Sequence, residues 1–116
     1  MTITRLEPGK RMSQAVKHGN TVYLAGQVAQ DYNGTIEKQT GEVLAAIDKL
    51  LAASGTSKSK VLSCQVILNN IADFAAMNTV YDAWIDPANP PARACIEARL
   101  AHPSLKVEII AIAALD

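Results

Sequence analysis

The sequence predicts an α+β fold in which two helices cover one face of a small mixed β-sheet. Three observations predict this class. Two segments repeat apolar residues at helical spacing, other segments have the apolar pattern of strands, and glycine, asparagine and proline separate the segments. The chain has 116 residues, which suffices for one compact domain but not for two, so we expect a single domain over residues 1–116.

The N-terminal part is predicted to form a β-hairpin, with a short strand near Thr2–Leu6 before it. Gln14–Val16 and Thr21–Gly26 flank the turn sequence His18-Gly19-Asn20. Asp31–Thr35 is predicted to be a loop, because it contains an Asn-Gly pair.

Two amphipathic helices are predicted after the hairpin. The first ends at Ser54-Gly55, where glycine favours a left-handed cap, and its inner positions are Ile36, Thr40, Val43, Ile47, Leu50 and Leu51. Asp73 stands where it can cap the second helix, whose inner positions are Phe74, Met77, Tyr81 and Trp84. Prolines end this helix and favour an extended segment after it, at Pro87, Pro90 and Pro91.

The remaining strands are predicted at Val61–Leu68, Ala92–Ala98 and Lys106–Leu115. The first alternates, with Ser63 and Gln65 on one face and the apolar residues on the other, which are Leu62, Cys64, Val66 and Leu68. The last is apolar on both faces, with Val107, Ile109, Ala111 and Ala113 on one and Ile110, Ile112 and Ala114 on the other. Two helices can cover only one face, so we expect a homo-oligomer whose sheets face inward. The alternative is an unusually apolar edge strand, which would be an aggregation site.

The balance of charges restricts the partners. Lys and Arg number 11, as do Asp and Glu, and the resulting net charge of +0 argues against a nucleic-acid partner. No apolar run reaches the roughly 18 residues of a membrane-spanning helix, and the N-terminus lacks a secretory pattern. We therefore expect a cytoplasmic protein with no membrane partner.

No metal or cofactor is implied. His18 and His102 form no metal-binding motif, Cys64 and Cys95 are too far apart in sequence for a CxxC site, and there is no glycine-rich phosphate motif.

Two charged residues, Arg93 and Glu108, stand in predicted strands, where burying a charge is costly. One interpretation is an ion pair between them. The other is a pocket in which the planar donor fork of Arg93 binds a carboxylate while Glu108 orients a water molecule. The pattern leaves both open.

Cys95 lies two residues after Arg93 and is predicted to share its strand face. It is either a nucleophile or a small buried apolar residue, and no histidine in the sequence is placed to activate it, which favours packing. Cys64 is predicted to pack in the core. Asn78, on the second helix, either reaches a site or faces solvent. The aromatic residues Phe74, Tyr81 and Trp84 are interpreted as core rather than as a platform for bases.

Several of these segments together resemble the signature of the RidA/YjgF family. The most specific part is Pro91-Ala-Arg-Ala-Cys-Ile-Glu, followed eleven residues after Cys95 by Lys106-Val-Glu-Ile. Supporting parts are Gln14, Leu24-Ala-Gly-Gln27, and Asp73-Phe-Ala-Ala-Met-Asn78 with Tyr81, and the likeness runs from about Met12 to Ala114. The resemblance implies a chorismate-mutase-like fold and a homotrimer whose sheets line a central barrel, with sites at subunit interfaces.

The resemblance also implies an activity. Many members of the family are enamine/imine deaminases, hydrolases that convert reactive 2-aminoacrylate and related imines to 2-keto acids and ammonia in metabolite damage control. By resemblance, Arg93 holds the substrate carboxylate, Glu108 orients or activates the attacking water, and backbone groups at Gly26 and Cys95 line the pocket, with Asn78 nearby. Such chemistry needs positioning and a proton path, because an iminium carbon is already electrophilic.

The sequence departs from the usual deaminase pattern at two positions. Met12 stands where a pocket tyrosine is usual, and Ala25 where a serine is usual. Two hydroxyl groups are therefore absent, which indicates a side branch of the family with its own substrate range. An alternative function is a module that binds a carboxylate or 2-keto acid without turnover. A third is a chaperone-like or ribonuclease-like role, although zero net charge and 4% aromatic residues argue against RNA.

Overall fold

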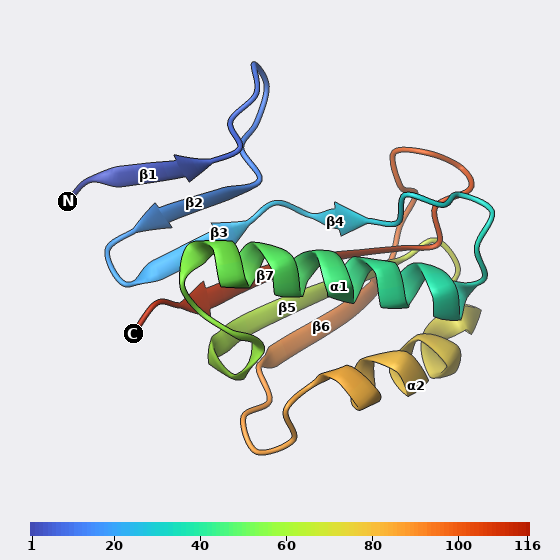
Figure 1. The fold of residues 1–116 in the computed structure, drawn as a ribbon. Helices are drawn as coiled ribbons and strands as arrows, with labels where there is room; N and C mark the ends of the chain where they lie inside the picture. The colour runs from blue at the N-terminus through green and yellow to red at the C-terminus, as the bar shows by residue number, and fades with distance from the viewer.

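A computed structural model describes all 116 residues as one mixed sheet with both helices on one side (Figure 1). The sheet order is β1-β2-β3-β7-β5-β6, and a short β4 also pairs with β7. The strands are β1 (Ile3–Leu6), β2 (Ala15–His18), β3 (Thr21–Leu24), β4 (Gln27–Val28), β5 (Val61–Leu68), β6 (Ala92–Glu97) and β7 (Val107–Ala114). The helices are α1 (Ile36–Ser54) and α2 (Phe74–Trp84), with single 3-10 turns at Lys58–Lys60 and Ile71–Asp73. The predicted α+β class is confirmed. Neither helix has the length and apolar character that crossing a bilayer requires.

The predicted N-terminal hairpin is confirmed, and so is the short strand before it. β2 pairs antiparallel with β3 around a tight turn in which Gly19 has φ +61°, a left-handed conformation that glycine adopts at little cost. After β3 the chain leaves the ladder for two residues and returns as β4. Tyr23 opposes Ile112 and Gln27 opposes Ile109, so this side advances four residues while β7 advances three. The extra residue is a bulge at Ala25 and Gly26, which the sequence pattern did not predict.

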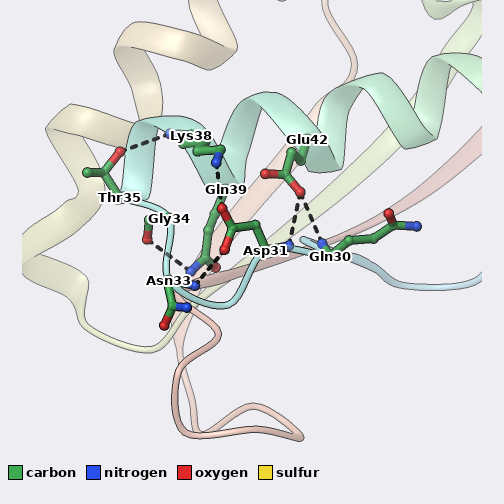
Figure 2. Close-up of polar contacts among 8 residues, drawn as sticks. All are labelled: Gln30, Asp31, Asn33, Gly34, Thr35, Lys38, Gln39 and Glu42. Atoms are coloured by element: carbon green, nitrogen blue, oxygen red, sulfur yellow. Dashed lines mark hydrogen bonds and ion pairs between the residues drawn. The ribbon is translucent and has the colours of Figure 1, made fainter.

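The start of α1 is fixed by side chains that satisfy free backbone groups (Figure 2). The Thr35 hydroxyl accepts a hydrogen bond from the Lys38 backbone amide at 3.2 Å, as an N-cap does. Glu42 Oε1 accepts from the amides of Gln30 and Asp31, and the Lys38 ammonium pairs with the Asp31 carboxylate. The helix ends as predicted at Gly55, whose φ is +88°.

A buried glutamine joins the start of α1 to the start of β7. Gln39 is 0% exposed, and its Nε2 donates to the carbonyl oxygens of Gly34 and Ser104 at 3.2 and 3.1 Å. Its Oε1 accepts from the backbone amide of Lys106 at 2.8 Å. The side-chain amide thus has three partners, which offsets the cost of burying it, and it fixes where β7 enters the sheet.

As predicted, the helices cover only one of the two apolar faces of β7. Val107, Ile109, Ala111 and Ala113 are 0% exposed and belong to the core formed with α1, together with Val43, Ile47 and Leu51. The alternate residues are only half-buried, because no helix lies on their side. We call this side the open face. It carries Glu108 on β7 and the apolar side chains of Tyr23, Ile67, Ile96, Ile110 and Ile112.

Two predicted core positions are wrong. Leu62 is 51% exposed, because a register shift between Val61 and Ser63 breaks the alternation of β5, while Cys64, Val66 and Leu68 are buried as predicted. Phe74 is 41% exposed at the start of α2.

The predicted cap of α2 is also corrected. Asp73 occupies the N-cap position, but its side chain makes no capping hydrogen bond. A 3-10 turn precedes the helix, and it is Asn70 that caps this turn by accepting from the amide of Ala72.

Candidate functional site

Arg93 lies on the edge strand β6 and points to the side of the sheet that carries α2. Its Nη1 donates a hydrogen bond to Oδ1 of Asn78 at 2.7 Å. The guanidinium carbon lies 4.7 Å from the ring centroid of Tyr81 and 5.8 Å from that of Phe74. A charged hydrogen bond and two aromatic rings therefore hold an exposed arginine in one orientation.

The arginine keeps most of its binding capacity. A guanidinium has five N–H donors, and within the chain only one of them is used, on Asn78. The remaining donors reach solvent, since Arg93 is exposed. This is the arrangement that a bidentate carboxylate or phosphate contact needs.

The three residues from α2 share one stripe of the helix. Phe74, Asn78 and Tyr81 are four and three residues apart, so they lie on one face. The sequence interpretation treated the two aromatic residues as core and left Asn78 open. The helical spacing of Asn78 between the two aromatic residues could have indicated that the three share one face. That this face lies against Arg93 on β6 is known only from the fold.

The two cysteines lie on the same side of the sheet as Arg93, and neither thiol is activated. Burial raises the pKa of the Cys64 thiol to about 11 despite its contact with the Tyr81 hydroxyl. Burial also raises the pKa of Cys95, against the opposing effect of the Arg93 charge. Burial and the neighbouring Cys64 raise the pKa of Tyr81 to about 12. Both thiols are therefore protonated at neutral pH, as the packing interpretation expects.

Glu108 lies on the open face, in the middle of the sheet. It opposes Val28 of β4 on one side and Ile67 of β5 on the other. Its carboxylate lies against Gly26: a Cβ built on that glycine would overlap Oε2 and would lie 2.9 Å from Cδ. Within the chain the carboxylate accepts no hydrogen bond and forms no ion pair, because Lys38–Asp31 is the only ion pair. A half-buried carboxylate with free lone pairs is suited to accept a proton from water.

Arg93 and Glu108 lie on opposite faces of the sheet, so of the two interpretations the ion pair within one chain is wrong. Arg93 is level with Cys64 on β5, and Glu108 is level with Ile67 on the same strand. These β5 residues are three apart with no irregularity between them, and side chains an odd number of residues apart point to opposite faces. One chain therefore presents Arg93 and Glu108 on two separate surfaces.

The bulge beside Glu108 is held by two glutamines. Gln27 Nε2 donates to Oε1 of Gln14 at 3.1 Å and to the carbonyl oxygen of Ala25 at 3.0 Å. The amide of Ala25 donates to the carbonyl oxygen of Gln14 at 2.8 Å. Ala25 is half-buried, and Met12 lies in the loop before β2 with 50% of its surface exposed.

None of the concave regions of the single chain is lined by Arg93 or Glu108. The largest, about 510 Å³, is formed by the loop from Gly9 to Met12. Two others of about 330 Å³ lie between α1 and β4, and the fourth lies beside Arg99. Arg93 and Glu108 thus lie on open surfaces of the single chain and not in a cavity.

Comparison with known proteins gives consistent matches over almost the whole chain. A family profile described as Endoribonuclease L-PSP matches residues 2–115. A RutC family protein from Haemophilus influenzae is 47% identical over 117 positions, which cover 97% of this chain and 98% of that protein. A RutC family protein from Escherichia coli is 39% identical and covers 99% of this chain and 100% of that protein. The crystal structure of a YjgF family member from Neisseria meningitidis has a TM-score of 0.96 and 42% identity, covering 100% of this chain and 97% of that one.

Proposed function

Because the chain belongs to the RidA/YjgF family, we propose that it hydrolyses 2-imino and 2-enamino carboxylates to 2-keto acids and ammonia. The observation that carries the proposal is the pair of complementary half-sites. One presents an oriented arginine with unused donors, and the other presents a carboxylate without a partner in its own chain. A small carboxylate-bearing imine needs both.

In this proposal Arg93 binds the substrate carboxylate. The contact to Asn78 and the rings of Tyr81 and Phe74 hold the guanidinium before substrate arrives, so less side-chain entropy is lost on binding. The bound carboxylate places the adjacent C2 carbon, which carries the imine, at a fixed distance from Arg93. Cys95 lines the site with its backbone groups and its small side chain. Its thiol takes no part in the reaction, because it is protonated.

Glu108 activates the water that attacks C2. As the water oxygen forms its bond to C2, the carboxylate accepts a proton and the C=N electron pair moves to nitrogen. The carboxylate passes this proton to the nitrogen, which gives a carbinolamine. The hydroxyl proton of the carbinolamine is then transferred to the nitrogen by the same carboxylate, the C–N bond breaks, and ammonia leaves as the C2 carbonyl forms. An enamine substrate enters the same path after its C3 carbon gains a proton. Nothing in the sequence requires a metal or cofactor to be part of these steps.

The proposal requires two subunits, because Arg93 and Glu108 lie on opposite faces of one sheet. We propose a homotrimer in which the open faces pack inward around a central barrel and each site lies at an interface. The apolar open face supports this, since a sheet face of this kind is otherwise an aggregation surface.

A trapping assay tests the function. An amino-acid oxidase generates imines from several amino acids, semicarbazide traps them, and the enzyme competes by hydrolysis. We expect the wild type to lower semicarbazone formation and Arg93→Ala and Glu108→Gln not to. Arg99→Ala is the matched control, because Arg99 is an exposed arginine just beyond β6. If Arg93→Ala hydrolyses imines as the wild type does, the proposal is wrong.

A second candidate is binding of a carboxylate or 2-keto acid without turnover. The half-buried Ala25 and exposed Met12 favour it, since neither offers the hydroxyl usual in deaminases of this family. A 2-keto acid would then raise the melting temperature in wild type and not in Arg93→Ala, while no imine is hydrolysed. RNA cleavage is not favoured by a net charge of +0.

A further inference from the structure

We propose that Gly26 is a positioning residue for Glu108, because its missing side chain leaves the space that the Glu108 carboxylate occupies. The three atoms nearest to a Cβ built on Gly26 all belong to Glu108: Oε2, which it would overlap, Cδ at 2.9 Å and Cγ at 3.2 Å. Real Cβ atoms essentially never approach other atoms below 3.0 Å, so one group would have to move. The inference rests on the proposed function, since it concerns the group that activates water.

The reason for glycine here is space and not backbone conformation. Gly19 and Gly55 are the glycines with positive φ, and Gly26 is not among them. An alanine at position 26 would therefore meet no penalty from its own backbone. The contact with Glu108 is what an added methyl group would disturb.

The backbone on both sides of this contact is fixed, so the carboxylate is the part that would move. The bulge at Gly26 is held by the hydrogen bonds among Gln14, Ala25 and Gln27. Glu108 sits between β4 and β5 in the centre of the sheet. A methyl group on Gly26 would turn the Glu108 side chain into another rotamer and carry its oxygens away from the attacking water. A misplacement of about 1 Å can lower a rate about a hundredfold.

A stability experiment tests the contact without any assay of activity. Gly26→Ala is made in the wild type and in Glu108→Ala, and melting temperatures of the assembled proteins are compared at one protein concentration. We expect Gly26→Ala to lower the melting temperature in the wild type and to have a clearly smaller effect when Glu108 is alanine. Gly41→Ala is the control, because its Cβ would meet nothing within 4 Å. An equal fall in both backgrounds would overturn the inference.

Kinetics test the positioning role. We expect Gly26→Ala to lower kcat about tenfold or more with little change in KM, because Arg93 is untouched. In the Glu108→Asp background the shorter side chain leaves more room for the added methyl group. Gly26→Ala should therefore lower kcat by a smaller factor in that background than in the wild type. An equal loss of kcat in both backgrounds, or a loss confined to KM, would contradict the positioning role. If the wild type hydrolyses no imine, the proposed function fails, while the melting-temperature comparison still decides whether Gly26 seats Glu108.

Discussion

Asn78 has one role that its hydrogen bond defines: it holds the Arg93 guanidinium against Tyr81. Asn78→Ala removes this partner while leaving the charge of Arg93 in place. We expect KM for imine substrates to rise about fivefold, which corresponds to about 1 kcal/mol for one hydrogen bond, with a smaller effect on kcat. The matched control is Thr79→Ala, since the Thr79 hydroxyl donates only to the Ala75 carbonyl oxygen of its own helix. A larger change in kcat than in KM would instead assign Asn78 to the chemical step.

Because of Cys64, we expect the stability of the protein to fall as pH rises in the alkaline range. Its thiol has a pKa of about 11 in the folded protein, above the value of about 8.5 expected when unfolded. A raised pKa gives stability that is complete below pH about 8.5 and is lost as pH rises toward 11. The whole loss is about 3 kcal/mol, from the difference between the two pKa values. Unfolding of reduced wild type and Cys64→Ala between pH 8 and 10.5 should show a steeper decline in the wild type; parallel curves would contradict this.

At the scale of elements, we expect Gln39 to contribute more to the free energy of unfolding than any exposed polar residue does. Gln39→Leu fits the volume but leaves the amide of Lys106 and two carbonyl oxygens without partners. We expect a loss of about 2–5 kcal/mol in the free energy of unfolding by urea, because unpaired buried polar groups are costly. Gln30→Leu, whose side chain makes no hydrogen bond, should change stability by less than about 0.5 kcal/mol. Similar losses in the two variants would show that the buried amide is unimportant.

The sequence predicts elements better than it predicts their irregularities. Helical spacing and the Ser54-Gly55 pair placed α1 correctly, and alternation placed β5 and both faces of β7. The bulges at Leu62 and at Ala25 and Gly26 were missed, because a bulge is defined by the length of the partner strand rather than by a local pattern. Phe74 was misplaced because the tertiary fold sets what the first turn of α2 faces: its ring is exposed and lies near Arg93 of the edge strand β6.

At the scale of the whole molecule, the same limit applies to the site. The chemistry of Arg93 and Glu108 follows from two charges in apolar strands, but whether the charges meet depends on strand register. Register is set by tertiary pairing, and it places the two residues on opposite faces. The proposed function therefore needs Arg93 and Glu108 from different copies of the chain, and it predicts that activity depends on assembly.

A substitution on the open face tests whether this face forms the proposed interface between subunits. Ile110 lies in its centre, half-buried and opposite Gln65 of β5. Ile110→Glu places a charge in the proposed interface, and we expect monomers by light scattering and a loss of imine hydrolysis of more than about tenfold. Ala45→Glu, on the exposed side of α1, should leave both properties unchanged. A variant that stays trimeric would show that the open face is not the interface.

Subunit mixing separates a shared site from a site within one chain. Arg93→Ala and Glu108→Gln should each be inactive alone. If one subunit supplies Arg93 and its neighbour supplies Glu108, a 1:1 mixture that is unfolded and refolded together assembles randomly, and about a quarter of the sites receive both intact residues. The mixture should then recover about a quarter of wild-type activity, whereas mixing without unfolding should recover little. A site built within one chain would recover none after refolding, because every chain in the mixture lacks one of the two residues.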